Sequence, residues 1–146
     1  MTARVPRGFS LIEVLVVAAI VAILAAIAVP PYGAYVQRSR LVDAIARLAD
    51  ARARMEQYFL DRRAYTDDAG RCGAAPPAAG SADAFELSCE ATASTYTYKA
   101  TGLAAKGMAA FAYTIDQSGL KATVSVPGGW RAHADCWTIR QDGLCV

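Results

Sequence analysis

The stretch that decides the fold is Gly8-Phe9-Ser10-Leu11-Ile12-Glu13 with the apolar run that follows it, VLVVAAIVAILAAIAV, as far as Val29. Residues 9–29 contain one ionisable side chain, Glu13. A helix of this segment would be roughly 31 Å long at about 1.5 Å per residue, and a bilayer core is about 30 Å thick. A carboxylate costs on the order of 2.5–3.5 kcal/mol in mid-membrane and less near the edge, so Glu13 indicates a functional charge.

The residues before this run carry the signature of a processed leader. Residues 1–8 contain Arg4 and Arg7 and no acid, and a small residue, Gly8, stands before the apolar segment, whereas an ordinary secretory signal is cleaved after it. This pattern closely resembles the class III signal of type IV prepilins, which has Glu as the fifth mature residue and Pro as the twenty-second, the places of Glu13 and Pro30. The resemblance implies cleavage between Gly8 and Phe9 and N-methylation of Phe9. The rival interpretation is a plain signal anchor.

Cleavage would change the charge balance. The chain has 15 Lys plus Arg against 13 Asp plus Glu, and loss of Arg4 and Arg7 leaves 13 of each. A neutral mature chain gives little reason to infer a nucleic-acid partner from the basic pI. Before cleavage, the two arginines are expected to keep the amino terminus in the cytoplasm and to send the carboxyl end into the periplasm.

Two features mark the apolar segment 9–29 and its end. Ala18, Ala22 and Ala26 recur every four residues, a spacing that lets helices approach closely, although alanine is common throughout this chain. Pro30 and Pro31 then remove two amide donors, which predicts a break in the helix.

Residues 30–63 are predicted to form the amphipathic second half of the long helix. Apolar side chains recur there at intervals of three and four, which is typical of one buried stripe. They are Tyr35, Val36, Leu41, Val42, Ile45, Leu48, Met55, Tyr58 and Phe59. Residues 32–63 carry a net charge of +3, whereas residues 64–146 carry −2. The basic side chains of the helix either form local ion pairs or meet the acidic parts of neighbouring subunits.

The sequence of residues 64–127 predicts a loop followed by a sheet. Residues 64–84 are rich in Ala, Gly, Pro and Asp, which indicates a connecting loop. In residues 85–127 the apolar period changes to two, which predicts four short antiparallel strands, with a turn at Asp116-Gln117-Ser118-Gly119. The apolar face of this sheet can cover the stripe of the long helix, so the predicted class is α+β.

Four cysteines fall in the part that is predicted to leave the cytoplasm. An even number there indicates disulfides, and the alternative, zinc, is disfavoured because gaps of 16 and 8 residues do not form knuckles. Of the three connectivities we choose Cys72–Cys89 and Cys136–Cys145, because each closes a short loop that few strand contacts would otherwise hold. Residues 128–146 then form a carboxyl-terminal loop bounded by a disulfide.

A second resemblance extends the first across the chain. The run R-M-E-Q-Y-F-L-D-R-R-A-Y before the loop, and the tail with its two cysteines, resemble PilE-like minor pilins. The family implies a long helix, transmembrane in its first half, packed on a four-stranded antiparallel sheet. It also implies a structural subunit that leaves the inner membrane for a surface filament serving adhesion, twitching motility or DNA uptake. The implied partners are other pilin subunits, the prepilin peptidase and N-methyltransferase, and an inner-membrane assembly platform.

Glu13 is the residue on which assembly is expected to depend. Cleavage creates a cationic amine at Phe9, and the Glu13 carboxylate of a neighbouring subunit can pair with it in the apolar core of a filament. The alternative is that Glu13 pairs with the Phe9 amine of its own chain, four residues away.

No catalytic set can be assembled from the sequence. His133 is the single histidine and has Asp135 nearby, but no nucleophile, base and orienting group stand in a recognisable arrangement. We therefore expect no enzyme activity, no cofactor and no metal site, and a surface or capping role for His133.

Two other functions stay open. A pilus-borne DNA receptor could use Lys106, Lys121, Arg131 and Arg140 as cations and Trp130 and Trp137 as stacking surfaces, although the part that follows residue 63 is net negative. A pseudopilin of a type II secretion system would share the first thirty residues.

Overall fold

The computed structural model of the protein describes residues 9–28 and 32–146. The predicted leader, residues 1–8, and the predicted helix break at Pro30 and Pro31 lie outside the described residues. The chain forms two compact units, Met1–Val36 and Gln37–Val146. The second unit is called the head here.

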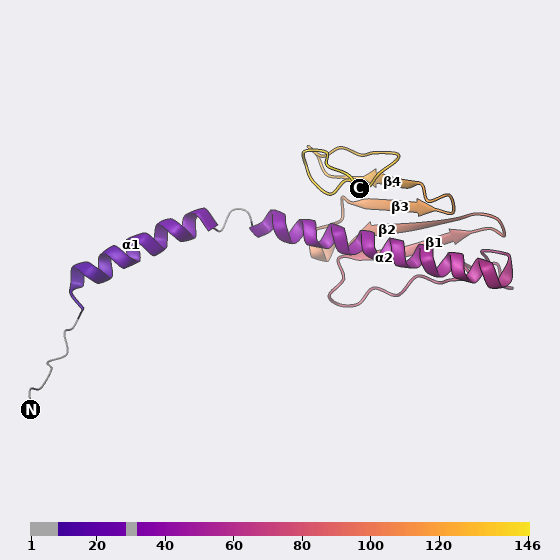
Figure 1. The fold of residues 1–146 in the computed structure, drawn as a ribbon, viewed down its shortest axis with the longest axis horizontal. Helices are drawn as coiled ribbons and strands as arrows, with labels where there is room; N and C mark the ends of the chain where they lie inside the picture. The colour runs from indigo at the N-terminus through magenta and orange to yellow at the C-terminus, as the bar shows by residue number, and fades with distance from the viewer. Residues whose placement is uncertain (1–8, 29–31) are drawn as a thin grey trace, which may run out of the picture. The chain divides into compact units, whose positions relative to one another are not determined.

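The apolar run forms helix α1, Leu11–Ala28 (Figure 1). Ser10 caps it, because its backbone oxygen accepts hydrogen bonds from the amides of Glu13 and Val14, and its hydroxyl lies 3.3 Å from the amide of Glu13. Such a cap satisfies donors that the first helical turn leaves unpaired. The described side chains of α1 are exposed throughout. Among the described residues, the helical stretch that begins at Leu11 is long and apolar enough to cross a membrane.

Helix α2, Tyr32–Arg62, carries the buried stripe of the head. Arg63, with a φ of 57°, ends it in the left-handed region, a common way for a helix to stop. The stripe is narrower than the sequence predicted: Val42 is 47% exposed and Tyr35 is 73% exposed. It also contains two alanines that the periodicity argument left out. Its buried members are Leu41, Ala44, Leu48, Ala51 and Met55.

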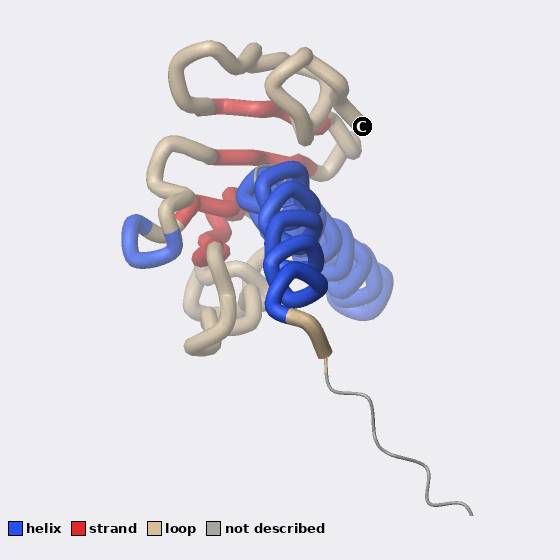
Figure 2. The backbone as a smooth tube through the Cα atoms, turned by 90° about the vertical axis from the view of Figure 1, so that its left-hand side faces the viewer, coloured by secondary structure: helices blue, strands red, loops and turns tan. Residues whose placement is uncertain are grey.

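The four predicted strands form one antiparallel sheet in the order β1-β2-β3-β4. Their bounds are β1 Phe85–Ala91, β2 Tyr96–Gly102, β3 Ala112–Asp116 and β4 Lys121–Ser125, with a short 3₁₀ helix, η1 Ala104–Lys106, between β2 and β3. The predicted turn between β3 and β4 is held by the Asp116 carboxylate, which accepts hydrogen bonds from the amides of Ser118 and Leu120. Figure 2 shows α2 lying across one face of the sheet.

The core lies between α2 and this face. Alternate residues of β2 are buried, as the period of two predicted. Three tyrosines, Tyr96, Tyr98 and Tyr113, are fully buried, and each phenol has a hydrogen-bond acceptor. Their acceptors are Glu56 Oε1, the carbonyl of Ala74 and the carbonyl of Thr138, respectively. The observed architecture is therefore the α+β fold that the sequence predicted.

Two disulfides complete the head, and they join the pairs that the sequence analysis chose. Cys72 is bonded to Cys89, which ties the loop after α2 to β1, and Cys136 is bonded to Cys145. The second bond closes the tail, residues 126–146, which lies beside β3 and β4 (Figure 1). The indole nitrogen of Trp137 anchors the tail to the sheet by donating to the carbonyl of Thr114 at 2.9 Å.

Candidate functional site

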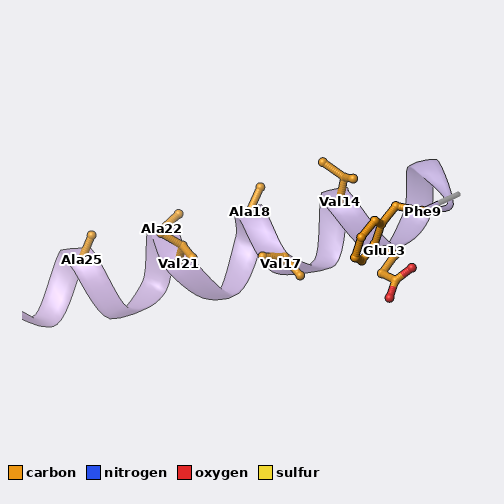
Figure 3. A pocket seen from close by; sticks show the side chains of 8 residues that line it. All are labelled: Phe9, Glu13, Val14, Val17, Ala18, Val21, Ala22 and Ala25. Carbon is orange, nitrogen blue, oxygen red and sulfur yellow. The ribbon is translucent and has the colours of Figure 1, made fainter.

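Glu13 and Phe9 lie on one face of α1, where they line a shallow apolar groove (Figure 3). The remaining residues of the groove are Val14, Val17, Ala18, Val21, Ala22 and Ala25. Three valines and three alanines therefore continue the lining of the groove along the helix from Glu13. Glu13 also stands in the first turn, where the positive end of the helix dipole favours an anion. This face can accept an apolar helix and present one negative charge to it.

Phe9, the predicted first mature residue, is 81% exposed next to the groove, and Gly8 lies outside the described residues. Phe9 Cα precedes the cap at Ser10, so an amine created there would sit one residue outside the helix.

Three arginines of α2 bind groups of their own chain. Arg40 donates to the carbonyl of Lys106 at 2.6 Å, and Arg47 pairs with Asp83 at 3.2 Å. Arg54 pairs with Asp50 one turn away on the helix at 2.8 Å. These contacts agree with the first of the two alternatives for the basic helix, in which its arginines bind groups of the same chain and not of a neighbouring subunit.

The four cations named as candidate DNA contacts lie on three different parts of the head. Lys106 ends η1 beside Arg40, near the start of α2, whereas Lys121 starts β4 beside the last half of that helix. Arg131 and Arg140 belong to the tail, where Arg140 pairs with Asp142 at 2.8 Å. The structure thus places Lys106 and Lys121 beside different parts of α2, and Lys121 beside Trp137 of the tail.

The two tryptophans are placed differently from each other. Trp137 is 2% exposed, with Lys121 over its ring at 4.9 Å, so the idea that it offers a stacking surface to bases is wrong. Its burial follows from its position in the tail, which folds back onto the sheet. Trp130 is partly buried, and its ring meets Phe111 edge to face at 5.0 Å.

A cleft between α2 and the sheet, lined by both charged and apolar side chains, brings together residues that no sequence pattern had grouped. Its volume is about 300 Å³, and its lining is Ala49, Arg52, Ala53, Glu56, Ile115, Lys121 and Trp137. Arg52 Nε is buried there without a hydrogen-bond partner in the described part of the chain. Glu56 accepts from the Tyr96 phenol at 2.7 Å, and burial together with this carboxylate raises the pKa of Tyr96. No local pattern could reveal the cleft, because Arg52 and Trp137 are far apart in the sequence.

His133 is not the surface or capping residue that the sequence suggested. It is partly buried, its Nε2 atom has no hydrogen-bond partner within residues 9–28 and 32–146, and its backbone carbonyl accepts from the amide of Thr123 at 2.7 Å. The side chain lies close to the sulfurs of Cys136 and Cys145. Proximity in the fold, rather than the spacing of the cysteines, brings these three residues together.

Comparison with known proteins fits these features. Residues 30–111 match a family model described as "Type IV minor pilin ComP, DNA uptake sequence receptor", and residues 4–29 match the prokaryotic N-terminal methylation motif. The fimbrial protein EcpC of Eikenella corrodens is 35% identical over 71% of this chain and 70% of its own length. No solved structure matches the chain at a significant level.

Two further relatives match about half of this chain. The type IV major pilin PilE1 of Neisseria gonorrhoeae is 35% identical over 49% of this chain and 43% of its own length. The type IV major pilin PilA of Myxococcus xanthus is 39% identical over 48% of this chain and 32% of its own length. The chain therefore spans less than half the length of these two relatives, but the family model and the Eikenella protein cover most of it. With a methylation motif that spans the exposed apolar helix α1, and a sheet and two disulfides after it, this chain belongs to the type IV pilin family.

Proposed function

We propose that the protein is a minor pilin, a structural subunit of a type IV pilus. Helix α1 holds it in the inner membrane with the head in the periplasm, the prepilin peptidase cleaves after Gly8 and methylates Phe9, and an assembly platform builds the subunit into a surface filament. Adhesion, twitching motility or DNA uptake would depend on that filament. The observation that carries the proposal is the groove of α1, where a single carboxylate is followed along the helix by alanine and valine side chains.

The exposure of α1 requires an apolar environment. Its large apolar side chains are half exposed or more, and burial of one such side chain stabilises by about 1.5–3 kcal/mol. Lipid supplies that environment before assembly, and helices of neighbouring subunits supply it in a filament. The small residues of the groove let another helix approach closely, so van der Waals contacts can replace lipid.

Glu13 fixes how far one subunit's α1 is displaced along the α1 of its neighbour. Once Phe9 carries the amino terminus, a neighbour's Glu13 at about 4 Å attracts it by roughly 4 kcal/mol at an effective dielectric of about 20, before desolvation is subtracted. Before assembly the carboxylate remains near the membrane surface, because it stands in the first turn of α1. A pair formed within one chain would have the same chemistry but would leave assembly unaffected.

The test is to replace Glu13 by Ala and by Gln and to measure each variant in sheared surface fibres by mass spectrometry. Glu13→Gln keeps the shape and removes the charge, and Val16→Ala, which does not line the groove, is the control. We expect both Glu13 variants to insert and to be cleaved normally but to be missing from the fibres, while Val16→Ala is present. Wild-type amounts of processed Glu13 variants in the fibres would overturn the proposed role of the charge. Absence of the unaltered protein from surface fibres would favour a pseudopilin.

A second candidate function, DNA reception, rests on the family model that covers residues 30–111. Of the four cations named as candidate DNA contacts, Lys106 alone lies within the matched residues, and Lys121, Arg131 and Arg140 follow them. The tail carries two arginines. Arg140 pairs with Asp142, whereas Arg131 is exposed and forms no ion pair with the described residues. A DNA surface could thus include Lys106 near η1, Arg131 on the tail, or both.

Duplex binding by the full-length protein in detergent tests this second function. Binding should weaken steeply as salt rises, and charge reversal at Lys106 or at Arg131 shows which part of the head takes part. No binding at low salt would remove the DNA function and leave the pilin function intact.

A further inference from the structure

The tail brings three metal-ligating side chains together at one place. The ligand atoms of His133, Cys136 and Cys145 all lie within 4.8 Å of one another. All three residues are partly buried, so the group is neither a chance surface cluster nor closed to an ion. Among the described residues, these three make up the one group of histidine, cysteine or acidic side chains that is close enough together to hold a metal ion.

His133 supplies an independent observation that points to a ligand. Its Nε2 atom is buried and has no hydrogen-bond partner among the described residues. Burying a polar nitrogen without a partner costs about 1–3 kcal/mol, so such an atom in a folded protein calls for an explanation. A neutral imidazole nitrogen is also the commonest protein ligand for metal ions.

The backbone that carries the three side chains is held without the disulfide. Trp137 and Val146 exchange two backbone hydrogen bonds of 2.9 and 3.0 Å, and Ile139 donates to Leu144 at 2.9 Å. These bonds keep the segments of Cys136 and Cys145 side by side. The Thr123 hydroxyl fixes the carbonyl of Cys136 at 2.7 Å, and the Thr123 amide fixes that of His133. Breaking the sulfur–sulfur bond would therefore leave the ligands near their present positions.

We propose that the reduced tail is a Zn²⁺ site made by His133, Cys136 and Cys145. Reduction of the disulfide by two electrons and two protons gives two thiols, and Zn²⁺ displaces both protons to form two zinc–thiolate bonds and one zinc–imidazole bond. Typical lengths are about 2.3 Å to sulfur and about 2.0–2.1 Å to nitrogen, so tetrahedral ligand atoms lie about 3.3–3.8 Å apart. To reach this geometry the two sulfurs must move apart from bonding distance to about 3.8 Å, and the imidazole must keep its nitrogen close to both of them. Water fills the fourth position.

The tail can therefore be held closed in two alternative ways, by the Cys136–Cys145 disulfide or by a bound Zn²⁺ ion. In the oxidised protein the disulfide occupies both sulfurs and no Zn²⁺ binds. In the newly made, reduced protein, Zn²⁺ holds the tail closed until a disulfide-bearing oxidant takes two electrons from the thiolates, forms the Cys136–Cys145 bond and releases the ion. The pair Cys72–Cys89 has no histidine beside it, because His133 is the single histidine of the chain, so it serves as an internal control.

The experiment uses the full-length protein in detergent, reduced under nitrogen by a phosphine, which becomes the phosphine oxide by taking its oxygen from water. Zn²⁺ binding is measured by titration and metal analysis, and Co²⁺ is used as a probe of thiolate coordination by its charge-transfer absorption. Two matched variants each retain one pair of thiols: Cys72→Ser/Cys89→Ser keeps the tail pair, and Cys136→Ser/Cys145→Ser keeps the other pair. His133→Gln removes the imidazole without altering a cysteine.

We expect one equivalent of Zn²⁺ in the reduced wild type and in the variant that keeps the tail pair, and none in the oxidised protein or in the variant that lacks the tail pair. His133→Gln should weaken binding by at least about tenfold. In the wild type, bound Zn²⁺ should protect Cys136 and Cys145, but not Cys72 and Cys89, from alkylation, a readout that needs no variant to fold. Equal affinity in His133→Gln, protection of the wrong pair, or no binding by the reduced protein would each overturn the proposal.

Discussion

Replacement of Thr123 by Val tests how the tail is held on the sheet. The Thr123 hydroxyl is nearly fully buried in β4, where it donates to the carbonyl of Cys136 at 2.7 Å and accepts from the amide of Thr138 at 2.8 Å. Neither backbone group has another recorded partner in the described part of the chain. Valine keeps the shape of the side chain but removes both hydrogen bonds.

The expected loss of stability follows from these two orphaned groups. Each buried polar group without a partner costs about 1–3 kcal/mol, so the sum is about 2–6 kcal/mol, with the lower end expected if water reaches the site. A typical domain is stable by about 5–15 kcal/mol, so the loss is a large part of the total. At about 4 °C per kcal/mol, the melting temperature should fall by at least about 8 °C.

Tryptophan fluorescence of the full-length protein in detergent, with both disulfides intact, is a suitable assay. The chain has two tryptophans, Trp130 and Trp137, and both lie in the tail next to the altered contact. Thr97→Val is the matched control, because Thr97 is exposed on β2 and the same substitution there should change the free energy of unfolding by no more than about 0.5 kcal/mol. If Thr123→Val were as stable as this control, the hydrogen bonds of Thr123 would not hold the tail.

Two further predictions concern the core of the head. Leu48→Ala should destabilise the head by about 2–5 kcal/mol in denaturant unfolding, whereas Val42→Ala should have little effect, because Leu48 is fully buried and Val42 is 47% exposed; equal effects would contradict the observed stripe. Burial raises the pKa of Tyr98 to about 12 and also raises that of Tyr113, so the stability that their neutral phenols contribute is complete below pH 10 and is lost as the pH rises towards 12. In an alkaline absorbance titration these phenols should ionise only as the head unfolds, and ionisation of all seven tyrosines near pH 10 in a folded head would refute this.

The sequence by itself determined the helices and strands of this protein and the position of its apolar helix α1. The apolar run with one carboxylate predicted α1, and the change of period from about 3.6 to two predicted where the helix gives way to strands. The short gaps between cysteines also favoured the two disulfides that the structure contains. These features depend on residues that are close together in the chain, so local spacing is enough to reveal them.

The tertiary structure alone decided which side chains meet. It buried Ala44 and left Val42 exposed, because the sheet covers only a narrow part of α2. It removed Trp137 from the surface and placed His133 beside two cysteines, although cysteine spacing had argued against a metal site. The burial of Trp137 and the position of His133 depend on how the tail returns to the sheet, and that path is set by hydrogen bonds and packing between residues far apart in the sequence, such as Trp137 with Thr114, which no local period records.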